Sequence, residues 1–238
     1  EWIHVPLDAE RWRSSVRGGS YCAFQRRYSG YSAVQSSQEF PALAYLTEEN
    51  LLPSEAVLMP GHTGDFISGG HIPESVLEMN GWEDVADYIV EKHFALWRPW
   101  GKRFCTQLTG VRAGLLEVIR AFGNCCTDAL AEAVEWFDWK ERQAKFIVPF
   151  VNVYRFYGRA FVLPLWARPI VDFFRSIPLV WKWRQNLYRR YLLHLDGSDF
   201  FSDVRPAPEY PGPRPRETGS IRSPKRATGE LRKEFSRL

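Results

Sequence analysis

The sequence predicts an α/β protein in which a parallel sheet is followed by a mainly helical half. Short apolar runs that end in glycine-rich loops come first, and apolar residues at helical spacing follow after Pro73. With 238 residues, of which 45% are hydrophobic, the chain can bury one substantial core. We therefore expect a sheet region at 1–75, a helical half at 76–202 and a disordered, basic, proline-rich tail at 203–238.

The first 75 residues alternate between extended and helical patterns. Residues 2–6 are typical of a strand, and a helix is expected over 8–16. The Gly/Ser/Tyr-rich residues 18–32 predict a loop, and 33–50 carry helical spacing. Residues 56–59 predict a short, buried inner strand. The alternation favours a parallel sheet.

The helical half is predicted from apolar periodicity. Helices are expected around 85–94 and 111–122, the second ending at Gly123, and a long one over 129–157 with a kink at Pro149. Shorter helices are expected at 169–175 and 185–195. From Val204 onward prolines alternate with charged residues without periodicity, which predicts disorder.

Charge, hydropathy and cysteines exclude several classes. The net charge of +3 comes from the tail, and the rest is nearly neutral, so we expect no nucleic-acid partner. No run of eighteen apolar residues occurs, which argues against a membrane span. The four cysteines form no C-x-x-C pair, and adjacent Cys125 and Cys126 cannot easily bridge each other. We therefore expect reduced thiols and a cytoplasmic chain.

The stretch EAVLMPGHTGDFISGGHIP, residues 55–73, is the first candidate site. A short apolar run ends there in a glycine-rich loop. In open α/β sheets ligands bind beyond the carboxyl ends of the strands, and glycines let backbone N–H groups approach phosphate oxygens. The loop is therefore a candidate phosphate site.

The residues Pro-Gly-His-Thr-Gly at 60–64 are locally similar to a zinc-binding turn of metallo-β-lactamases. That fold also needs an H-x-H-x-D-H cluster earlier in the chain, where only His4 occurs. A metal hydrolase of that kind is the less favoured alternative.

A longer series resembles the ATP-pyrophosphatase domain of the asparagine synthetase family, an adenine nucleotide alpha hydrolase-like domain. The strand VLMP, the loop GHTGDF in place of Gly-Glu-Gly-Ala-Asp-Glu, and a following Gly-Gly occur at 57–70. The family's order is kept by DWKERQAKFIV at 138–148, LPLW at 163–166, VDFF at 171–174 and QNLYRRYL at 185–192. The resemblance covers roughly residues 1–196 and is to a branch found among polysaccharide-modification genes. It implies the remainder of a Rossmann-like parallel-sheet domain followed by its helical half.

The resemblance implies an AMP-forming amide ligase. A small carboxylate is adenylated by ATP, pyrophosphate leaves with Mg²⁺, and ammonia, free or from a glutaminase domain or subunit, displaces AMP. The residues that would act on the phosphates are Asp65 as magnesium ligand, His62, Arg142 and Lys145 as further catalytic groups, and Gly61, Thr63 and Gly64 as the nucleotide-binding loop.

Each of these residues also has a structural interpretation. Asp65 suits the cap of a helix beginning at Phe66, and a loop histidine such as His62 is often simply solvated. Arg142 and Lys145 lie three apart on one helical face, which is typical of a solvated surface.

The chain also departs from the family pattern. The two glutamates of the family's loop fall at His62 and Phe66, its late lysine near Asn186 and its aspartate after Pro-Leu-Trp at Ala167. These departures leave open a non-catalytic relic whose aromatic helical half binds a partner, for example through Trp97 and Trp100.

The family's Ser-Gly-Gly-x-Asp-Ser nucleotide loop does not occur in these residues. The nearest string, VRGGSY at 16–21, lacks the aspartate. The chain also opens inside a strand-like run at Glu1. We therefore expect it to be a piece of a longer protein that carries this loop upstream, and to be inactive alone.

Overall fold

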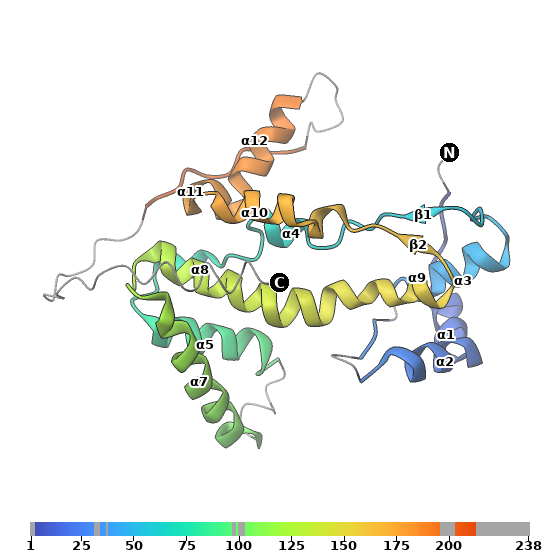
Figure 1. Ribbon diagram of the computed structural model, residues 1–238, viewed down its shortest axis with the longest axis horizontal. Coiled ribbons are helices and arrows are strands. Elements are labelled where there is room, and N and C mark those ends of the chain that lie inside the picture. Colours follow the sequence, from blue (N-terminus) through green and yellow to red (C-terminus); the bar gives the residue numbers. More distant parts are fainter. Residues whose placement is uncertain are drawn as a thin grey trace, which may run out of the picture. The chain divides into compact units, whose positions relative to one another are not determined.

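The computed structural model describes residues 3–30, 34–36, 38–96, 99, 103–195 and 203–212 (Figure 1). Helices dominate these residues, and they contain a small parallel sheet of two strands. The chain divides into two compact units. Unit 1 comprises Glu1–Ile67 and Trp139–Arg175, and unit 2 comprises Ser68–Asp138 and Ser176–Leu238.

Unit 1 begins with three helices, α1 (Ala9–Arg17), α2 (Gly19–Tyr28) and α3 (Phe40–Glu48). The Oδ1 atom of Asp8 accepts a hydrogen bond of 2.8 Å from the Arg11 N–H and so caps α1. Pro41 lies in the first turn of α3, where its missing N–H costs nothing. The helix expected at 8–16 is confirmed, and the helix expected over 33–50 begins only at Phe40.

The prediction of a loop at 18–32 is wrong, because α2 occupies most of it. Phe24 of α2 is fully buried against the rings of Phe40 and Phe156, and this burial outweighs the weak helix propensity of the segment. Gly18 is extended and separates α1 from α2. The strand expected at 2–6 is also wrong for residues 3–6, which form none, and Trp2 lies outside the described residues.

The sheet joins β1 (Val57–Leu58) to β2 (Ala160–Phe161) in parallel, with Val57 opposite Ala160. The Val162 N–H donates a 2.9 Å hydrogen bond to the Leu58 carbonyl. A parallel sheet is therefore present, but β1 is not the buried inner strand expected at 56–59. It has one neighbouring strand among the described residues, and Val57 is 56% exposed. Leu58 and Phe161 pack against the core cluster that contains Phe24.

A continuous helical run leads towards β2 (Figure 1). It comprises α8 (Thr127–Phe137), the π-helical η3 (Asp138–Ile147), the 3₁₀ turn η4 (Val148–Val151) and α9 (Asn152–Phe156). The long helix expected at 129–157 is thus confirmed as a helical run. The expected disturbance at Pro149 takes the form of the 3₁₀ turn, since a proline cannot donate the α-helical hydrogen bond.

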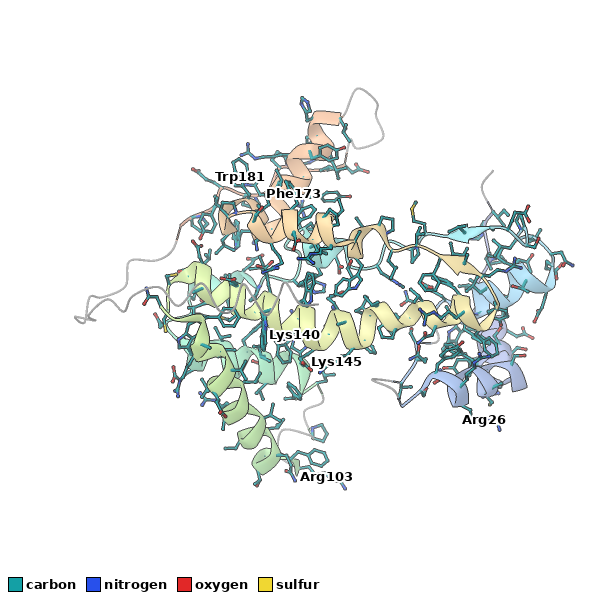
Figure 2. All side chains as sticks on the ribbon, viewed as in Figure 1. Arg26, Arg103, Lys140, Lys145, Phe173 and Trp181 are labelled. Atoms are coloured by element: carbon teal, nitrogen blue, oxygen red, sulfur yellow. The ribbon has the colours of Figure 1, made fainter. Side chains whose placement is uncertain are left out.

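The rest of unit 1 holds three short elements around a small apolar cluster. Phe66, Ile67 and Val171 are its buried members, and Trp139 and Leu165 pack against them. The elements are α4 (Gly64–Ile67), η5 (Pro164–Trp166) and α10 (Arg168–Ser176). Phe173 on α10 stays exposed (Figure 2).

Unit 2 is helical around one large apolar core. Val76, Val85, Ile89, Ile119 and Leu130 are fully buried in it. Its further elements are η1 (Glu74–Leu77), α5 (Trp82–His93), α7 (Cys105–Ile119), η2 (Arg120–Phe122), α11 (Leu179–Lys182), η6 (Trp183–Gln185) and α12 (Asn186–Leu195). The predicted helices are therefore confirmed for the described residues of this half.

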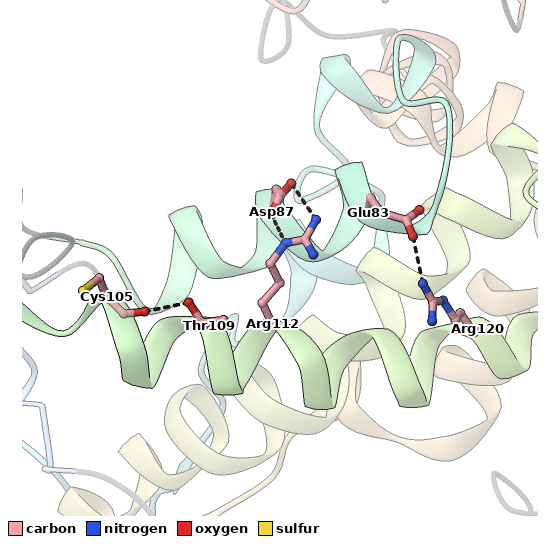
Figure 3. A network of polar contacts seen from close by, with 6 residues as sticks. All are labelled: Glu83, Asp87, Cys105, Thr109, Arg112 and Arg120. Carbon is pink, nitrogen blue, oxygen red and sulfur yellow. Dashed lines mark hydrogen bonds and ion pairs between the residues drawn. The ribbon is translucent and has the colours of Figure 1, made fainter.

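Ion pairs join α5 to α7 and to η2 on the surface of unit 2 (Figure 3). The Arg112 guanidinium contacts both carboxylate oxygens of Asp87, and Arg120 Nη2 lies 2.8 Å from Glu83 Oε1. Both pairs are exposed, so they contribute little to stability.

Residues 203–212 of the predicted tail have neither helix nor strand, and Tyr210 packs edge-on against Trp183. Residues 213–238, like Trp97 and Trp100, lie outside the described residues. None of the helices formed by the described residues combines the length and the apolar character that crossing a bilayer requires.

Candidate functional site

The candidate loop connects the carboxyl end of β1 to the start of α4, both in unit 1. Because β1 and β2 run in parallel, their carboxyl ends meet at one edge, and residues 59–63 follow that edge. The loop therefore has the position in which open α/β proteins bind ligands.

Thr63 holds the loop in a strained conformation. Its φ angle is +72°, which is unusual for a β-branched residue, and its side chain is buried. Its hydroxyl donates a 3.1 Å hydrogen bond to the carbonyl of Leu165, in the LPLW segment. Thr63 thus fixes the loop from inside, and its predicted role in cofactor binding stays a prediction.

The two glycines of the loop have different surroundings. A Cβ atom on Gly64 would lie 2.9 Å from the Leu165 Cδ1 atom, so this glycine lets the loop and the LPLW segment pack closely. A Cβ atom on Gly61 would have no heavy atom within 4 Å. Only Gly61 therefore leaves open space beside the backbone, as close approach of a phosphate requires.

His62 lies against Glu39, which precedes α3. The Nε2 atom of His62 is 3.3 Å from Glu39 Oε1, and the His62 side chain is only 14% exposed. The ring of Phe150 approaches His62 edge-on, with the ring centroids 6.2 Å apart. The imidazole is therefore held in place rather than solvated.

Glu39 is the centre of this polar group. Tyr154 of α9 donates its hydroxyl hydrogen to the Oε2 atom of Glu39. Burial raises the pKa of Glu39, but the hydrogen bonds from His62 and Tyr154 and the charge of His62 outweigh it, so the pKa is lowered. Burial, together with the bond to Glu39, raises the pKa of the Tyr154 hydroxyl. Glu39 is thus a carboxylate at neutral pH and Tyr154 a neutral donor.

The second ring nitrogen of His62 has no partner among the described residues. Its Nδ1 atom is buried and makes no hydrogen bond to them. Buried polar atoms are nearly always satisfied, so such an atom calls for an explanation. A ligand oxygen at the loop would supply one.

Asp65 lies in the first turn of α4 and is exposed. Its Oδ1 atom accepts a 2.8 Å hydrogen bond from the Phe66 N–H, which is the structural role considered for it. An exposed carboxylate beside a loop fits a magnesium ion, because Mg²⁺ takes one or two carboxylates together with phosphate and water oxygens. Among the described residues there is no cluster of three or more His, Cys, Asp or Glu side chains that would enclose a metal ion.

Arg142 and Lys145 both lie on η3. Arg142 is partly buried. Lys145 is exposed (Figure 2), and its Nζ atom lies 2.5 Å from Glu141 Oε2 on the same helix. π-Helical turns are rare and are frequently found at functional sites. The role of both cations at the loop stays a prediction.

Two positions at which the chain departs from the family pattern lie in different units, Asn186 in unit 2 and Ala167 in unit 1. Asn186 is buried, and its Nδ2 donates to the Val180 carbonyl while its Oδ1 accepts from Arg190 Nε, at 3.2 and 3.0 Å. Ala167 follows η5 and is exposed.

Sequence reasoning missed Glu39 and Tyr154. They are 115 residues apart, and neither belongs to a local motif, so only the fold brings them together. Comparisons with family models, curated proteins and solved structures found no match for this chain.

Proposed function

We propose that this chain is part of an asparagine synthetase-like, ATP-dependent amide ligase. The observation that carries the proposal is the strained loop at the carboxyl end of a parallel strand, with open space at Gly61. Two of the segments that resemble the family also meet in unit 1, since Thr63 of the loop donates a hydrogen bond to Leu165 of LPLW. The adenylated acceptor would be a small carboxylate, and ammonia would come from solution or from a glutaminase domain or subunit.

The residues of the loop would divide the work on the phosphates. When bound, ATP supplies the leaving group that activates the carboxylate. Gly61 leaves room for phosphate oxygens next to the backbone, and Asp65 would hold the Mg²⁺ ion that accompanies them.

His62 takes the place of an acid in the family's loop, and in this chain it is held by the carboxylate of Glu39. Glu39 faces the Nε2 atom of His62, which leaves the buried Nδ1 atom for a ligand, and with both ring nitrogens protonated the Nδ1–H would donate to a phosphate oxygen. A cation here would stabilise the negative charge that develops on the leaving pyrophosphate.

Pyrophosphate exchange tests the proposal on the complete gene product. We expect Mg²⁺-dependent exchange between ATP and pyrophosphate in the presence of aspartate or another small carboxylate. Asp65→Asn should lower the exchange rate about 100-fold or more. Asp172→Asn is the matched control, because Asp172 is an exposed aspartate of the same unit that pairs with Arg168. Its rate should stay unchanged.

Three results would contradict the proposal. Equal rates for Asp65→Asn and the control would remove the loop from the chemistry. Stoichiometric zinc that is released by His62→Ala would support the metal-hydrolase alternative instead. Binding of ATP without any exchange would support a non-catalytic relic, for which the buried amide at Asn186 is the supporting observation.

A further inference from the structure

The sequence contains a single Asn-Gly pair, Asn80–Gly81, which lies between η1 and α5 in unit 2. An asparagine side chain can react with the backbone nitrogen of the next residue, and a glycine there leaves the approach open because it has no Cβ atom. Asn80 is exposed, so water has access to it. The pair is therefore a candidate site of chemical modification.

The fold does not require a glycine at position 81. The φ and ψ angles of Gly81 are −169° and −175°, an extended conformation that any residue adopts. A Cβ atom on Gly81 would lie 3.3 Å from Glu83 Oε2, at the end of an exposed side chain that can move aside by a few tenths of an ångström. Alanine would therefore fit here, and the feature that only glycine supplies is the open approach to Asn80.

The two reacting groups are only weakly held. The Gly81 N–H donates no hydrogen bond to any described residue. The Asn80 side chain donates one hydrogen bond of 3.2 Å, from Nδ2 to the exposed carbonyl of Glu78, and such a bond contributes little. The backbone N–H of Asn80 donates a 2.6 Å hydrogen bond to Asp84 Oδ2, which holds the main chain at the start of α5. The Asn80 side chain can therefore turn towards the Gly81 nitrogen.

We propose that Asn80 is a site of spontaneous deamidation. The Gly81 nitrogen attacks the Cγ atom of Asn80, a new C–N bond forms, and the bond from Cγ to Nδ2 breaks. The proton of the Gly81 N–H passes to the departing amide group, which leaves as ammonia, and a succinimide ring remains. Water then opens the ring at either carbonyl and gives aspartate or isoaspartate. Water is the only co-reactant, and this inference does not rest on the proposed amide ligase.

Isoaspartate at this position would loosen the start of α5. In isoaspartate the main chain passes through the former side chain and gains one methylene group before Gly81. Met79 and Trp82, on either side of the pair, are both buried in the apolar core of unit 2. A chain that is anchored on both sides does not accommodate an extra group without strain, so the bond from Asn80 to Asp84 or the burial of Trp82 must be lost. Ordinary aspartate adds no main-chain atom and lacks this effect.

Peptide mass spectrometry tests the proposal after incubation of the full chain at neutral pH and physiological temperature. Asn50 and Asn124 serve as internal controls, because both are exposed but are followed by Leu51 and Cys125. Asn80 should deamidate at least about tenfold faster than either control. Isoaspartate should form with the aspartate, and its carboxylate can be labelled by an isoaspartyl methyltransferase.

A substitution at Gly81 tests the role of the open approach. Gly81→Ala should slow deamidation of Asn80 by about tenfold or more, because the methyl group hinders the attacking nitrogen. Gly110→Ala, in α7 of the same unit, is the matched control and should leave the rate unchanged.

Three outcomes would overturn the proposal. They are an unmodified Asn80, a rate no faster than that of Asn50 or Asn124, and an unchanged rate in folded Gly81→Ala. The first two need no variant, so they hold even if Gly81→Ala fails to fold.

Urea denaturation of the isolated isoaspartate form tests the consequence for α5. This form should unfold at a lower urea concentration than Asn80→Asp, which carries the same added charge without the extra methylene group. Equal midpoints would overturn the loosening of α5.

Discussion

Glycines serve opposite purposes in two regions of this molecule. In the loop of unit 1, Gly61 faces open space, with no heavy atom within 4 Å of the position of a Cβ atom. In the turn of unit 2, Gly69 has a φ angle of +96°, and a Cβ atom there would lie 2.2 Å from the carbonyl oxygen of Lys182. The first glycine has unfilled space beside it, and the second makes room for the protein's own backbone.

This difference separates residues that the sequence presents as one glycine-rich stretch. The spacing of glycines in the sequence cannot distinguish a ligand-binding glycine from a packing glycine, because both need the absence of a side chain. The polar contacts of the two units also differ. Glu39 and His62 in unit 1 are partly buried, whereas the ion pairs that α5 makes in unit 2 are exposed. Substitutions at these positions test the comparison directly.

The largest effect is expected for Gly69→Ala. The added methyl group would collide with backbone atoms of Lys182, which cannot move aside as a side chain does, and alanine is disfavoured at this φ angle. We expect the free energy of unfolding to fall by about 3 kcal/mol or more, measured by urea denaturation. The control is Gly110→Ala, in the helix α7, where a Cβ atom has open space. Equal stability of the two variants would contradict the packing role of Gly69.

A smaller effect is expected for Glu39→Gln. The substitution removes the charge that accepts from Tyr154 and faces His62, so the free energy of unfolding should fall by about 1–2 kcal/mol. Glu49→Gln, at the exposed end of α3, should change it little. If the two variants were equally stable, the polar group around Glu39 would not contribute to folding.

The same carboxylate should make the stability depend on pH in the acid range. The pKa of Glu39 is lowered in the folded state, so below its ordinary value of 4.5 the unfolded chain binds the proton more readily. Its contribution to stability is therefore complete above about pH 4.5 and is lost as the pH falls through the lowered value. Urea denaturation between neutral pH and about pH 3 should show a shallower acid loss for Glu39→Gln than for the parent chain. Parallel curves would assign the acid loss to other carboxylates.

The smallest effects are expected for the glycines of the loop. Gly64→Ala should lower stability by about 1 kcal/mol, because the Leu165 side chain can shift away from the new methyl group. Gly61→Ala should stay within about 0.5 kcal/mol of the parent. In the complete gene product, however, Gly61→Ala should weaken pyrophosphate binding, since it narrows the open space. Unchanged pyrophosphate binding would remove Gly61 from the proposed site.

The sequence predicted the elements whose information is local. The spacing of apolar residues was enough for α5 and α7, and helices were also expected close to α1 and α12, since such signals lie within a few turns. It failed at α2, where Gly18 and Gly19 mark the boundary between two helices rather than a loop, and where the burial of Phe24 decides the structure.

The candidate site was predicted in part for the same reason. The loop and its place after a strand followed from the local pattern of glycines, and β1 lies close to where it was expected. Nothing local indicated Glu39, Tyr154 or the strand β2, because their contacts join segments about a hundred residues apart. The exposure of β1 could not be predicted either, because it follows from the small size of the sheet, which has only two strands among the described residues.

The hydrogen bond from Thr63 to Leu165 joins residues that are 102 positions apart in the chain. This separation matters during synthesis, because the two segments leave the ribosome at different times. Unit 1 is built from two separate stretches of chain, with a stretch of unit 2 between them. At about 5–20 residues per second, a ribosome would take about 5–20 s between releasing β1 and releasing its partner strand. During that interval the loop has neither β2 nor the LPLW segment to hold it. The residues of β1 therefore stay unpaired until β2 has been synthesised. During this interval they are accessible to chaperones.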